Sequence, residues 1–200
     1  MKNLVLFILC LFVFSCENTQ INPNGFYAKQ VGIIPLDTTM VWNYEISIYD
    51  SSRVYLYSIS EKIVDTTVLN GLPAYKMRYT SGNYIAYYKL QNTIEGLTSE
   101  RNGNYSYIKY PTSVNDTFVS ALWTTNNCQI SQYSTTLYTD TTVTVNGQIY
   151  DNCVIYSTIK DTLCGVILAN SISYYKPNLG LVYRVVLKPN NDTSYIMRII

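Results

Sequence analysis

Hydrophobic and polar residues alternate along much of this chain with a period of two, which is the period of a β-strand. Trp42 and Tyr44 fall on one face of such a strand, while Asn43 and Glu45 fall on the other. The segment 182–188 alternates in the same way. This pattern is typical of antiparallel sheets with one face toward water. Beyond the N-terminal segment no 3.6-residue stripe is sustained, so the sequence predicts strands and little helix.

Turn sequences separate these runs at intervals that suit β-hairpins. Asn-Gly occurs at Asn70-Gly71 and at Asn146-Gly147, and it favours a type I′ turn because both central residues need positive φ. Tyrosine contributes 21 of 200 residues and accompanies abundant Thr, Val and Ile, which are strand residues. We therefore predict an all-β fold: an antiparallel barrel, half-barrel or sandwich of about a dozen strands.

Five short sequence motifs, called landmarks below, occur twice in the same order, with offsets of about 75 to 87 residues between the two copies. They are Val41-Trp42 and Leu122-Trp123, Asp65-Thr66-Thr67-Val68 and Asp140-Thr141-Thr142-Val143, Asn70-Gly71 and Asn146-Gly147, Tyr87-Tyr88-Lys89 and Tyr174-Tyr175-Lys176, and Gly96-Leu97 and Gly180-Leu181. The order predicts two related meanders, 40–101 and 121–184, with Trp42 and Trp123 as equivalent core anchors. The alternative is coincidence in a sequence built from few residue types.

The N-terminal segment has the pattern of a secretory signal. Lys2 precedes an unbroken apolar run from Leu4 to Phe14, which is shorter than the roughly 20 residues that a spanning helix needs. The tetrad Val13-Phe14-Ser15-Cys16 resembles the lipobox of bacterial lipoproteins, and this resemblance implies that Cys16 is lipidated and becomes the new N-terminus. The alternative is an ordinary secretory signal with an incidental cysteine.

These features predict the organisation of the whole chain. Residues 1–15 form a lipoprotein signal peptide, and the polar stretch 16–25, with Pro, Asn and Gly, forms a tether. Residues 26–200 are long enough to bury the core of a single β-rich domain.

Composition excludes several kinds of chemistry. With no histidine, the chain cannot build a Ser-His-Asp or Cys-His nucleophile system, and a zinc site is not expected. The 14 basic and 13 acidic residues nearly balance, so nucleic acid is not an expected partner. A carboxylate pair could serve a glycosidase, but the candidates occupy positions typical of solvated strand faces and turns. These candidates are Glu45, Glu61, Glu95 and Glu100. We predict no enzyme, catalytic residue, metal or cofactor.

Besides Cys16, three cysteines follow the signal peptide, and an exported protein can oxidise two of them. A turn at Lys160-Asp161 would make a hairpin that brings Cys153 and Cys164 together, so we predict a disulfide between them. Cys128 could instead face Cys153 if one long hairpin turned at Asp140-Thr141, although the Asn-Gly turn that follows argues against it.

The second half of the chain resembles a module of exported proteins of Bacteroidota-type bacteria, many of them lipoproteins. In these proteins a tryptophan strand precedes a Val-x-Val-x-Gly hairpin, a strand ending near Asn-Cys, and a Tyr-Tyr-x-Pro-x-x-Gly-Leu-Val segment. The matching residues here are Trp123, Val143–Gly147, Asn152-Cys153 and Tyr174–Val182. The resemblance implies an exported β-rich lipoprotein and transfers no catalytic residue.

Two kinds of function remain. The first is a binding module in the cell envelope, anchored to a membrane, and most simply to the outer membrane, through Cys16. Its ligand would be apolar or lipid-like inside the barrel, or a glycan stacked on exposed tyrosines such as Tyr84, Tyr87, Tyr105, Tyr107 and Tyr110. The second is a structural or assembly lipoprotein that docks to an envelope protein, by an open strand edge for example.

Overall fold

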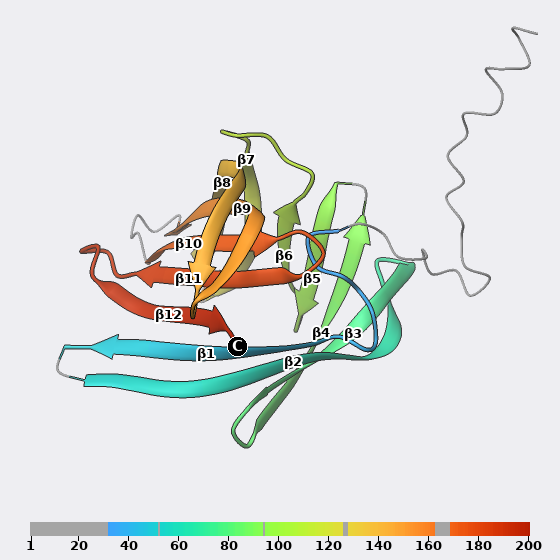
Figure 1. The fold of residues 1–200 in the computed structure, drawn as a ribbon. Helices are drawn as coiled ribbons and strands as arrows, with labels where there is room; N and C mark the ends of the chain where they lie inside the picture. The colour runs from blue at the N-terminus through green and yellow to red at the C-terminus, as the bar shows by residue number, and fades with distance from the viewer. Residues whose placement is uncertain (1–31, 52, 94, 126–127, 163–168) are drawn as a thin grey trace, which may run out of the picture.

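The structure, a computed structural model, describes residues 32–51, 53–93, 95–125, 128–162 and 169–200 (Figure 1). Its regular elements are twelve strands. These are β1 (Val41–Asp50), β2 (Arg53–Leu69), β3 (Leu72–Ser81), β4 (Tyr84–Thr93), β5 (Gly96–Arg101), β6 (Asn104–Lys109), β7 (Thr117–Thr125), β8 (Cys128–Val145), β9 (Gln148–Thr162), β10 (Ala169–Lys176), β11 (Gly180–Leu187) and β12 (Thr193–Ile199). Among the described residues, none forms a helix of the length and apolar character that a membrane span requires.

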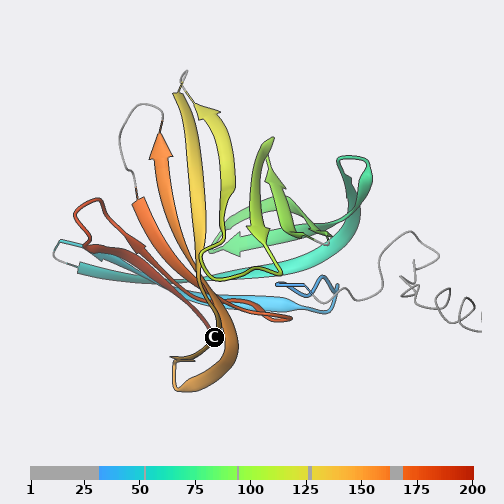
Figure 2. The same cartoon turned by 90° about the horizontal axis from the view of Figure 1, so that it is seen from above.

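The strands form one closed antiparallel barrel in which each strand pairs with its neighbours in sequence. The first and last strands close the ring, with Tyr44 opposite Ile199 and Ile48 opposite Tyr195. Figure 2 shows this ring from above. The all-β prediction is confirmed, and of the three predicted architectures the barrel is the observed one. The ladder between β6 and β7 is the shortest in the ring, with Tyr105 opposite Leu122 and Ser106 opposite Ala121. Docking to an envelope protein stays a prediction.

Tight turns join the strands where the sequence predicts them. Asn70-Gly71 links Leu69 to Leu72 as a two-residue turn, with φ values of 52° and 78°. Asn146-Gly147 links β8 to β9 with φ values of 52° and 81°. Both central residues of each turn have positive φ, as a type I′ hairpin requires.

The core fills one part of the barrel interior. Trp42 is 2% exposed, and its indole Nε1 donates to the Leu179 carbonyl oxygen at 2.5 Å. The segment before β1 packs against this core through the buried Ile33 and the partly buried Ile34 and Leu36. The other buried members of the cluster are Tyr44, Ile46, Ile59, Ile63, Met77, Leu90, Leu97, Val154, Tyr156, Tyr175, Leu181 and Met197.

The turn predicted at Lys160-Asp161 is wrong, while the pairing of Cys153 with Cys164 stays a prediction. No turn occurs at Lys160-Asp161, because β9 continues through this point to Thr162. Cys153 is a buried free thiol in a second apolar cluster, and burial raises its pKa. Cys164 and the side chain of Cys128 lie outside the described residues. The register therefore gives no support to a bridge between Cys153 and Cys164.

The two sets of sequence landmarks fall on corresponding strands. They lie on β1 and β7, β2 and β8, β4 and β10, and β5 and β11, so each set spans one half of the ring. The tryptophans do not correspond within their strands, because Trp42 is near the start of β1 and Trp123 is near the end of β7. Of the two tryptophans, only Trp42 has a described side chain, so the structure does not test whether they are equivalent. The duplication of one meander therefore stays a prediction.

Candidate functional site: an amphipathic cavity inside the barrel

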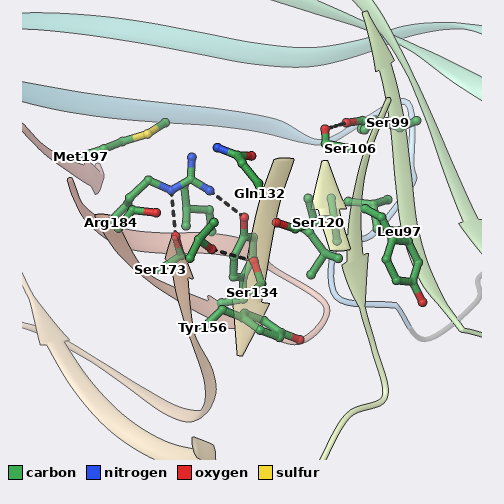
Figure 3. A pocket seen from close by; sticks show the side chains of 18 of the residues that line it. Leu97, Ser99, Ser106, Ser120, Gln132, Ser134, Tyr156, Ser173, Arg184 and Met197 are labelled. Carbon is green, nitrogen blue, oxygen red and sulfur yellow. Dashed lines mark hydrogen bonds between the residues drawn. The ribbon is translucent and has the colours of Figure 1, made fainter. Parts of the chain in front are cut away.

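A cavity of about 330 Å³ lies inside the barrel (Figure 3). Eight strands enclose an interior that side chains just fill, and twelve enclose a wider one. Here several of the inward positions carry serine, whose small side chain leaves this wider interior partly open. The volume lies at the lower end of the range for small-molecule sites.

One layer of the cavity wall is apolar and aromatic. Leu97 on β5 faces Ile108 on β6 in register, and both line the cavity. Phe118 on β7 contacts Tyr156 on β9 edge to face, with ring centroids 5.8 Å apart, and Tyr156 contacts Tyr175 on β10 in the same way. Edge-to-face contacts of this kind stabilise the aromatic part of the wall.

The adjacent layer is polar, since most of the inward residues next to the apolar ones are small and hydrophilic. It consists of Ser99, Ser106, Ser120, Gln132, Ser134, Thr158, Ser171, Ser173 and Arg184. Some of these hydroxyls form hydrogen bonds with one another. The hydroxyl oxygens of Ser99 and Ser106 are 2.6 Å apart, and those of Ser134 and Thr158 are 2.7 Å apart. The cavity is therefore amphipathic, with two layers of opposite character.

Arg184 on β11 is the cation of the polar layer. Its Nε donates to Ser173 Oγ and its Nη2 donates to the Tyr175 hydroxyl oxygen, both at 2.9 Å. The third nitrogen, Nη1, donates no hydrogen bond within the described part of the chain. In Figure 3 the guanidinium points into the same space as Gln132 and Ser120. Two neighbours thus fix the group while one of its edges faces the cavity.

Ser120 lies at a bulge in β7, where the register with β8 shifts between Val119 and Ala121. Its side chain is 8% exposed, and its hydroxyl has no hydrogen-bond partner in the described chain. A buried polar group without a partner is costly, and such groups mark positions where something else supplies the bond. The bulge therefore directs an unsatisfied hydroxyl to the cavity wall.

Glu61 on β2 is the other charged residue of the cavity wall. Burial raises the pKa of its carboxyl group, while a hydrogen bond with Tyr88 and the attraction of Arg184 act in the opposite direction. Glu61 and Arg184 make no direct ion pair among the described contacts. The expectation that Glu61 is a solvated surface residue is wrong, because its strand face turns toward the barrel interior.

Replacement of Glu61 by Gln should change how stability depends on pH. The folded protein holds the Glu61 proton more tightly than the unfolded chain does, so the wild type is favoured relative to Glu61→Gln at low pH. This advantage should disappear as pH rises from below the ordinary value of 4.5 through the raised folded pKa. Urea unfolding of both proteins across this range measures the difference, and a difference that grows with pH would contradict the prediction.

The other predicted carboxylates lie elsewhere. Glu100 forms an ion pair with Lys89 at 3.4 Å, Glu45 lies 3.7 Å from Arg198, and Glu95 is exposed. None of these three lines the cavity. Among the described residues no group of three or more His, Cys, Asp or Glu side chains is placed to hold a metal ion.

The tyrosines proposed as a glycan platform divide into two groups. Tyr84, Tyr87 and Tyr105 are exposed, and two of them are engaged by cations: Arg101 donates to the Tyr84 hydroxyl at 2.8 Å, and the Lys76 ammonium lies 4.6 Å from the centre of the Tyr87 ring.

The remaining two tyrosines of that set lie closer to the barrel interior. Tyr107 lines the cavity wall, and Tyr110 packs against the core. The five rings therefore do not form one surface.

Neither a family model nor a curated protein matches the chain. A solved structure from Parabacteroides distasonis, of a protein considered to be a lipoprotein, has a TM-score of 0.51 at 14% identity and covers 86% of this chain and 98% of that chain. A Bacteroides fragilis protein considered to be exported, with a YmcC-like fold, has a TM-score of 0.45 at 11% identity over 80% of this chain and 92% of its own. LprF from Mycobacterium bovis has a TM-score of 0.21 at 10% identity over 80% and 83%. The resemblance to exported β-rich lipoproteins of Bacteroidota-type bacteria is confirmed at the level of the fold by the first of these.

Proposed function

We propose that this protein is a lipoprotein of the cell envelope, anchored to the outer membrane through Cys16, that binds a small molecule inside its barrel. The observation that carries the binding function is the amphipathic cavity, with the unsatisfied Ser120 hydroxyl in its wall. A ligand that supplied the missing hydrogen bond would also fill space that the serines leave open.

The wall favours a ligand with both apolar and polar parts. A wholly apolar molecule would leave the polar layer without partners, and burying unpaired polar groups is unfavourable. Surface binding of glycans has weaker support, because Tyr84 and Tyr87 already contact charged side chains. The structure therefore supports a site inside the barrel better than one on its outer face.

The anchor is tested by replacing Cys16 with Ala. We expect this variant to be released from membranes, because a lipobox cysteine carries several acyl chains and their removal leaves no stable attachment. Fractionation followed by a carbonate wash measures the release. Cys10→Ala is the matched control, since Cys10 lies in the signal peptide and should not alter anchoring. Continued sedimentation of the Cys16→Ala protein with membranes would show that the assignment is wrong.

Ligand binding is tested by native mass spectrometry of the protein purified from its own envelope. We expect the wild type to carry a copurifying small molecule and Ser120→Met to lose it. Methionine fills part of the cavity, and the substitution breaks no hydrogen bond of the described chain. Val119→Met, at the adjacent and 50% exposed position, is the control that should keep the molecule. An empty wild type, or equal occupancy in all three proteins, would overturn the proposal.

A further inference from the structure

The polar layer has one property that the proposed function leaves unspecified: a surplus of hydrogen-bond donors around a fixed cation. Arg184 uses Nε and Nη2 to reach Ser173 and Tyr175, which leaves Nη1 without an acceptor in the described chain. The Tyr175 hydroxyl accepts from the arginine, so its own proton is available to an acceptor. The Ser120 hydroxyl also lacks a partner.

The surroundings of the arginine point in the same direction. Arg184 is partly buried in the cavity wall, and a guanidinium withdrawn from water is retained at low cost only when acceptors satisfy it. Glu61 also lines the cavity and attracts the guanidinium, but the two groups form no ion pair among the described contacts, and the Glu61 carboxyl group interacts with Tyr88. The exposed edge of the guanidinium therefore suits an oxyanion, which can accept two parallel hydrogen bonds from arginine.

The apolar layer defines the rest of the ligand. Leu97, Ile108, Phe118 and Leu181 line the cavity next to the polar layer, and they offer no hydrogen bond to a second polar group. An occupant with one polar end and an apolar body would match both layers at once.

We propose that the cavity binds an amphipathic organic anion, with its carboxylate or phosphate ester held by Arg184, Tyr175 and Ser120 and its apolar body against Leu97 and Phe118. This inference rests on the proposed function and specifies its ligand class. Arg184 provides the charge, and Ser173 and Tyr175 position it.

The test compares probes of equal chain length and different head groups. Decanoate, decyl phosphate, decanol and decyltrimethylammonium are titrated into the purified full-length chain by calorimetry, below the critical micelle concentration of each. We expect at least one anion to bind at least about tenfold more tightly than decanol, the size of a charge-assisted hydrogen bond, and the cation to bind most weakly. The comparison of decanoate with decyl phosphate distinguishes the two anion types.

Variants assign this preference to the arginine. Arg184→Gln should remove the difference between the anions and decanol, whereas Arg198→Gln, on the neighbouring strand and outside the cavity wall, should preserve it. Tyr175→Phe should weaken the preference several-fold, and it provides the test if Arg184→Gln does not fold.

The outcomes separate the two proposals. If all four probes bind equally, or if Arg184→Gln keeps the anion preference, the anion assignment is wrong while the cavity remains a binding site. A neutral oligosaccharide as the copurifying molecule would have the same consequence. If no probe binds and the purified protein carries nothing, both proposals fail.

Discussion

Trp42→Ala should lower the free energy of unfolding by about 3 to 5 kcal/mol, the usual cost of removing a large aromatic side chain from a core. Trp42 is 2% exposed and packs against the Gly180 backbone and Ile34, where the chain before β1 meets the start of β11. No neighbour can refill this space without moving one of those segments. Chemical denaturation followed by tyrosine fluorescence or circular dichroism measures the loss.

Two controls distinguish the packing of the ring from its hydrogen bond. Trp42→Phe keeps an aromatic ring but leaves the Leu179 carbonyl without the indole donor, which should cost about 1 to 3 kcal/mol. Val41→Ala, at the adjacent and 46% exposed position, should change stability by less than about 0.5 kcal/mol. A loss below about 1 kcal/mol for Trp42→Ala would show that the residue is not a core anchor.

The strands of this fold could be predicted because alternation and Asn-Gly turns are local signals. The closure of the ring could not. It depends on pairing between β1 and β12, for example Glu45 opposite Arg198, and no local pattern records a contact between residues so distant in sequence. The sequence therefore left barrel, half-barrel and sandwich open, and the long-range register decides among them.

A ligand site inside the barrel was predicted, but its polar layer was not, because polar residues face inward on part of the barrel. On β7, β8 and β9 the exposed residues include Val119, Tyr133 and Ile159, while Ser120, Ser134 and Thr158 face inward. A period-two pattern identifies two faces of a strand and does not say which is inside. A small polar residue at alternate positions usually faces water, so no local pattern identified these serines as cavity residues.

That Glu61 and Arg184 line the same cavity was not predicted, for a related reason. Glu61 and Arg184 are far apart in sequence and stand in ordinary strand segments, with no motif around either. A usable signal was the run of inward small residues on consecutive strands, Ser99, Ser106 and Ser120, each two positions from a large apolar residue. In a wide barrel such a run predicts open space.

Gly96→Ala should be the most damaging single-methyl addition among the described glycines. Gly96 starts β5 with a φ of 152°, in a region that is essentially restricted to glycine. A Cβ atom at this position would lie 2.1 Å from the Ile108 carbonyl oxygen, which belongs to the backbone of β6 and cannot rotate away. β5 and β6 would have to separate, and with them Leu97 and Ile108, which form part of the apolar layer of the cavity.

We expect Gly96→Ala to lower the free energy of unfolding by about 3 kcal/mol or more, because backbone strain and the steric clash add together. Gly71→Ala is the matched control, since Gly71 has a φ of 78° with no atom within 4 Å of the added Cβ, so only the strain of a left-handed alanine remains. That strain costs about 1 to 2 kcal/mol. Urea denaturation of both variants measures the difference, which isolates the contact between β5 and β6. Equal losses in the two variants would mean that these strands are not as close at Gly96 as the register requires, and that the apolar wall of the cavity is built differently.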